Sequence, residues 1–71
     1  MSMKRTPEDP KVLVERLKRD LEELIHRSRQ DIERVDDARA KVMFETAAEV
    51  LTGVKTACEH FEAGTEAAFQ T

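Results

Sequence analysis

Apolar side chains recur at helical spacing through the first half of the chain. They return every three or four residues and end near residue 35, whereas charged side chains such as Glu15, Lys18 and Glu22 lie on the rim or the back of the same helix. This pattern predicts an amphipathic helix over residues 10–35. The positions on its apolar stripe are Val14, Leu17, Leu21, Leu24, Ile25, Ser28, Ile32 and Val35.

The second half carries two apolar rows at strict seven-residue spacing. Phe44, Leu51 and Cys58 widen the resulting stripe on one side. Two such rows predict a helix, at about residues 38–63, that packs along another helix at a shallow angle. One row is Met43, Val50, Ala57 and Gly64, and the other is Ala47, Val54, Phe61 and Ala68.

Residues with known preferences for helix ends mark the expected boundaries. Asp9 can cap a helix that starts at Pro10, either Asp36 or Asp37 can cap the second helix, and Gly64 can end it. The two stripes differ in phase between about residues 35 and 42, which favours a hairpin of two nearly equal arms. One long helix in a coiled coil is the alternative, because a straight helix drifts by only about 20° per heptad.

The predicted fold class is therefore all-α, with a two-helix hairpin over residues 9–64. Residues 1–8 are polar and without period, so we expect a disordered N-terminal segment, and residues 65–71 form a C-terminal tail. A chain of 71 residues buries a modest share of its surface. We therefore expect the hairpin to dimerise into an antiparallel four-helix bundle, with core and interface positions Leu17, Leu21, Leu24, Ile32, Met43, Ala47, Val50, Val54, Ala57 and Phe61.

Charge and composition narrow the classes of function. Residues 1–35 hold nine Lys and Arg against eight Asp and Glu, and residues 36–71 hold three against seven, for a net charge of −3. Basic and acidic residues are interleaved, so the chain lacks the dense basic face of a nucleic-acid binder. No apolar run exceeds three residues and no signal peptide is visible, so we expect no membrane association and a cytoplasmic location.

The segment ELIH raises the question of a metal site. Glu23 and His26 have the Glu-x-x-His spacing of carboxylate-bridged metal sites in helix bundles, but helical rotation turns them away from the apolar stripe. We therefore expect no metal and no cofactor. The alternative is a metal-binding bundle assembled across subunits, in which Glu23, His26, Glu45, Glu49 and His60 would supply the ligands.

The sequence lacks the parts of an enzyme. It has no phosphate-binding loop, no nucleophile motif and no pair of closely spaced cysteines, and Cys58 is expected to be a small core residue. Ala47, Gly53, Ala57 and Gly64 favour a close helix–helix contact. The predicted function is a non-enzymatic self-association or protein-interaction module, most simply a homodimer, with a further protein partner as an additional possibility.

Overall fold

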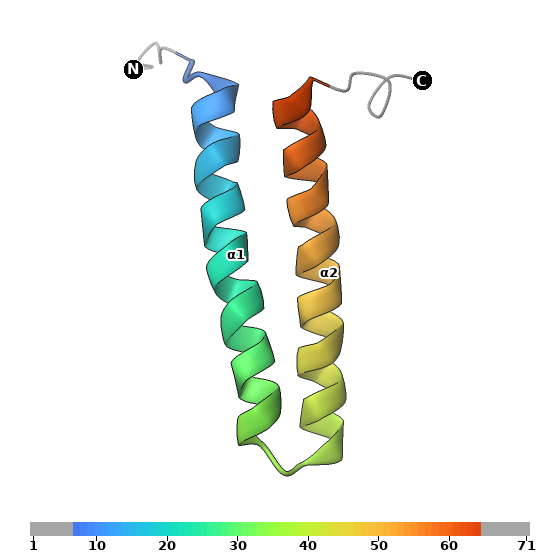
Figure 1. Cartoon of the computed structure of the whole chain (residues 1–71). Helices are drawn as coiled ribbons and strands as arrows, with labels where there is room; N and C mark the ends of the chain where they lie inside the picture. The colour runs from blue at the N-terminus through green and yellow to red at the C-terminus, as the bar shows by residue number, and fades with distance from the viewer. Residues whose placement is uncertain (1–6, 65–71) are drawn as a thin grey trace, which may run out of the picture.

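Two antiparallel helices form the described part of the chain, residues 7–64 of a computed structural model (Figure 1). Helix α1 spans Pro10–Arg34 and helix α2 spans Ala38–Ala63. This confirms the all-α hairpin and shows that the alternative of one long helix is wrong. The predicted segment 1–8 lies outside the described residues except for Pro7 and Glu8, and the predicted tail 65–71 lies outside them entirely.

The helix ends follow from local chemistry. The Asp9 side chain accepts a hydrogen bond from the Lys11 amide at 2.9 Å, and Pro10 takes the first helical position, where no N–H is needed. Helix α1 stops at Arg34 because Val35 has extended backbone angles, φ −111° and ψ 147°. The helix thus ends within one residue of the expected position at about residue 35.

Asp37 is the residue that starts α2. Its carboxylate accepts hydrogen bonds from the amides of Arg39 at 2.8 Å and Ala40 at 3.0 Å. At the other end Gly64 adopts the left-handed conformation, φ 71° and ψ 24°, which a glycine enters without steric cost. Its N–H donates to the Phe61 carbonyl at 3.1 Å, so the predicted stop at Gly64 is confirmed.

The core between the helices is thin. In the described residues the buried side chains are Leu21 and Ile25 on α1 and Ala48 and Cys58 on α2, and none of them is less than 2% exposed. Two of these four are small, so the helices can approach closely but bury little apolar surface. The expectation that Cys58 is a core residue is confirmed.

The side of α2 that packs against α1 is not the side that carries its two heptad rows. The contact runs along Ala48 and Cys58, with Phe44 and Leu51 half-buried beside them. Within the hairpin, most of the predicted core positions are instead exposed, and their burial in a four-helix bundle stays a prediction. The exposed positions are Leu17 at 47%, Leu24 at 38%, Met43 at 53%, Val50 at 60%, Val54 at 41% and Phe61 at 38%, together with Ala57; Leu21 is buried, and Ile32 and Ala47 are half-buried.

The cap of α2 gives a direct test of the hairpin's boundaries. Replacing Asp37 with alanine removes the acceptor for two free amides, and we expect it to cost about 1 kcal/mol of unfolding free energy. Urea unfolding followed by circular dichroism measures this. Asp36→Ala is the matched control, since it removes the neighbouring exposed carboxylate and leaves the cap in place. Equal losses in both variants would contradict the assignment of Asp37 as the cap.

Candidate interaction surface

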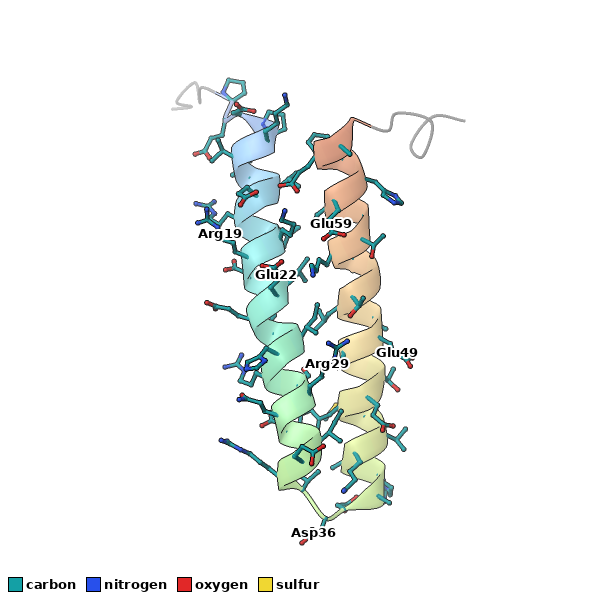
Figure 2. All side chains as sticks on the ribbon, in the orientation of Figure 1. Arg19, Glu22, Arg29, Asp36, Glu49 and Glu59 are labelled. Carbon is teal, nitrogen blue, oxygen red and sulfur yellow. The ribbon has the colours of Figure 1, made fainter. Side chains whose placement is uncertain are left out.

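One side of the hairpin is held by ion pairs that cross between the helices. The Lys18 ammonium lies 2.7 Å from the Glu62 carboxylate, and the Lys55 ammonium lies 3.5 Å from that of Glu22. Each helix therefore supplies one lysine to a glutamate of the other. Figure 2 shows Glu22 on α1 and Glu59 on α2 on this side of the hairpin. We call Glu15, Lys18, Glu22, Lys55, Glu59 and Glu62 the ion-pair face.

The pair of Lys18 and Glu62 is the most enclosed of these contacts, with the side chains 21% and 24% exposed. The hydrogen bond from Lys18 holds the pKa of Glu62 below its ordinary value of 4.5. The same bond raises the pKa of Lys18 above its ordinary 10.5, with a smaller contribution from nearby Glu15 and Glu22. Both shifts favour the charged pair, so the contact stabilises the hairpin across the neutral range.

An uncharged apolar row runs along α2 on another side of that helix. The row returns every three or four residues and consists of Met43, Ala47, Val50, Val54, Ala57 and Phe61. Its four large members are between 38% and 60% exposed, and Met43, Thr46, Ala47, Val50 and Leu51 line a shallow apolar depression there. The row lies about 100° around α2 from the buried row of Ala48 and Cys58.

Exposed leucines of α1 lie on the same side of the hairpin as this row. Leu13, Leu17 and Leu24 are 38%, 47% and 38% exposed and lie about 80° around α1 from the buried Leu21 and Ile25. On each helix the exposed apolar row is reached by rotating in the same sense from the buried row. Because the helices are antiparallel, both rotations lead to the same side of the hairpin, and this side is opposite the ion pairs. We call these three leucines and the α2 row the apolar face.

The five residues of the metal alternative are all exposed and do not gather. Glu23 and His26 are on α1, and Glu45, Glu49 and His60 are on α2. His26 lies in a shallow depression beside Arg29 and Lys55, two cations that disfavour a bound metal ion. Over residues 7–64, no three His, Cys, Asp or Glu side chains are placed to hold a metal together. A site formed across subunits stays untested.

Cys58 is poorly placed for chemistry, since it is a free thiol buried at 6% exposure between the helices. A nucleophilic cysteine needs access to its substrate and a base beside it. The thiol instead fills space next to α1. Its position fits that of a small apolar side chain that lets the two helices pack closely.

The reasoning from sequence missed parts of both faces. Leu13 was not among the predicted interface positions, although it stands four residues before Leu17 and so shares its side of the helix. The reciprocal ion pairs were also missed. The sequence does contain a signal for these ion pairs. Lys18 and Lys55 interrupt the rows of residues along which the two helices pack, and a charge in such a row needs a partner.

Neither described helix is long and apolar enough to cross a membrane. No protein-family model, curated protein or solved structure matches this chain. The apolar face is therefore the feature of the hairpin that bears on function.

The Lys18–Glu62 pair predicts how stability depends on pH. Because the pKa of Glu62 is lower in the hairpin than in the unfolded chain, its stabilising contribution is complete above pH 4.5 and is lost as the pH falls below that. The raised pKa of Lys18 acts at the other end, where the contribution is lost as the pH rises past 10.5. Between these limits we expect no change from this pair.

Glu62→Gln should therefore be less stable than the parent at pH 7 and should lose less further stability on acidification to pH 3. Thermal unfolding by circular dichroism from pH 3 to pH 7 measures the difference. Glu23→Gln is the control, because it removes an exposed carboxylate that joins none of the ion pairs between the helices. Parallel pH profiles for Glu62→Gln and the parent would contradict the prediction.

Proposed function

We propose that this protein is a non-enzymatic association module whose apolar face binds a second copy of the same hairpin. The observation that carries the proposal is the division of the hairpin into two sides. One side consists of ion pairs that join α1 to α2, and the other presents large apolar side chains to solvent. A monomer gains nothing from exposing such a face, whereas an association surface requires it.

The size of the apolar face suits a dimer. Seven large apolar side chains on it are between 38% and 60% exposed. They hold on the order of 500 Å² of accessible surface, which is near the top of the range of about 300–600 Å² for the largest apolar patch on a typical monomer. This apolar area would form the centre of a standard interface, to which each partner gives about 800 Å² in total, with polar residues at its rim.

The thin core supports the same proposal. Four buried residues, of which Ala48 and Cys58 are small, provide little hydrophobic stabilisation for two helices of 25 and 26 residues. Chains of this size commonly need a disulfide, a metal or association to be stable. Packing two apolar faces together gives an antiparallel four-helix bundle with a core of ordinary thickness.

The first test is native mass spectrometry of the untagged protein prepared without chelator. We expect a homodimer without bound metal. Whole-number metal mass on the oligomer, lost in His26→Ala or His60→Ala, would instead support the bundle that binds metal across subunits. A monomer at micromolar concentration would contradict the proposed function.

A charge on the apolar face should prevent association. In Val54→Asp, a dimer would bury a carboxylate without a partner in each copy, at a cost of about 3 kcal/mol or more per site. We expect loss of the dimer and loss of helicity, since the hairpin depends on association. Size-exclusion chromatography with light scattering and circular dichroism measure both.

Val42→Asp is the matched control for this variant. Val42 has the same side chain, lies on the same helix and is 60% exposed, but it stands outside the apolar row. This variant should remain dimeric and helical. Unchanged oligomer size and helicity in Val54→Asp would show that the face does not mediate association.

A further inference from the structure

The apolar row of α2 has the same sequence of sizes when it is read from either end. It begins and ends with its largest side chains, Met43 and Phe61, and the small Ala47 and Ala57 follow inward. Val50 and Val54 stand at the centre. The three pairs are all symmetric about position 52, near the middle of the helix, and the row is at 3.5-residue spacing throughout.

A row with this symmetry matches its own copy in the antiparallel direction. When two such helices are related by a two-fold axis at position 52, Met43 faces Phe61 of the second copy, Ala47 faces Ala57, and Val50 faces Val54. Each layer then pairs residues of similar size, and the same patch serves both copies, as a two-fold interface demands. A parallel pairing would instead place Met43 on Met43 and Ala47 on Ala47.

The distribution of charge on the two helices favours α2 over α1 as the centre of a contact between two copies. No position of the α2 row is charged, so its two-fold copy meets it without like-charge repulsion. On α1 the corresponding row is interrupted, because Asp20 and Asp31 stand in line with Leu17 and Leu24. The leucines of α1 can flank a seam but cannot form one along the whole helix.

Gly53 is the exposed residue beside the expected axis. A glycine in the middle of a helix costs about 1 kcal/mol relative to alanine, and a Cβ added here meets nothing within 4 Å in the hairpin. The fold of one hairpin therefore does not require the glycine. At a two-fold axis the same residue approaches its own copy, and the missing side chain lets the two backbones come closer.

We infer that two hairpins associate through an antiparallel α2–α2 seam, with a two-fold axis near position 52 and with Gly53 of each copy beside it. This rests on the proposed function and specifies its geometry. The partner is a second copy of this chain, and α1 of each copy lies on the flank of the seam. The competing arrangement places α1 of one copy against α2 of the other, which separates the two α2 helices diagonally across the bundle.

A single cysteine distinguishes these arrangements, because only a residue near a two-fold axis meets itself. Gly53→Cys is made in a Cys58→Ala background and treated with a short bismaleimide cross-linker. We expect covalent dimers to form more than about tenfold faster than in a Thr56→Cys control, since the seam raises the effective concentration of one thiol near the other. Thr56 is exposed on the same helix but about 140° from the centre of the apolar row.

An exchange of charges tests the register independently. Ala47→Glu and Ala57→Lys should each weaken the dimer by about tenfold or more, and the double variant should recover most of that loss through a salt bridge between the copies. Positions 47 and 57 are about 15 Å apart along one helix, so they cannot pair within it. Ala47→Glu with Ala63→Lys has the same added charges but an exposed lysine off the row, and it should show no recovery.

The outcomes separate the two proposals. Rapid cross-linking at Gly53→Cys together with recovery in the 47/57 pair supports the seam. If native mass spectrometry shows that the uncross-linked variants are dimeric, slow cross-linking equal to that of Thr56→Cys overturns the seam and leaves the association module in place. Dimers that show no recovery in the 47/57 pair overturn the register. A monomeric parent protein overturns both proposals.

Discussion

The reciprocal ion pairs between the helices determine which side of α2 faces α1. The row of Ala48 and Cys58 includes the charged Lys55 and Glu62, whereas the row of Val50 and Val54 carries no charge, so apolar burial alone does not favour the side that α2 turns toward α1. In the packing observed, Lys18 reaches Glu62 and Lys55 reaches Glu22. Exposed ion pairs contribute little to net stability, but they discriminate effectively between packings of similar apolar content. The apolar face remains exposed in the hairpin because the ion pairs and the contact between the helices lie on other sides of α2.

This choice explains how so short a chain can form a hairpin and still present a large apolar face to solvent. A two-helix protein has too little volume for a closed core, and the contact here relies on Leu21 and Ile25 against the small Ala48 and Cys58. Small residues on α2 allow close approach but supply little buried area. The proposed dimer would supply the missing burial from a second molecule, and α2, which has the longer uninterrupted apolar row, would provide most of it.

The sequence determined the elements more completely than their packing. Asp9, Pro10, Asp37 and Gly64 act locally, through hydrogen bonds and backbone angles within a turn of each residue, so the helix ends could be predicted to within one residue. The rotation of α2 could not be predicted in this way. It depends on Glu62 meeting Lys18, 44 residues away in the chain. Heptad spacing identified two apolar rows on α2, but the hairpin packs through the neighbouring positions Phe44, Ala48, Leu51 and Cys58.

The separation of the two faces has a consequence for how association can be controlled. The contacts within the hairpin include charges that respond to salt and to extremes of pH, whereas the apolar row of α2 carries no titratable group. Added salt screens the ion pairs but does not weaken hydrophobic contact. Conditions that weaken the contact of α1 with α2 would therefore leave the forces of the proposed seam unchanged. The two sides of α2 therefore rely on different forces: charged contacts hold α1 against α2, whereas any association through the apolar row rests on hydrophobic burial.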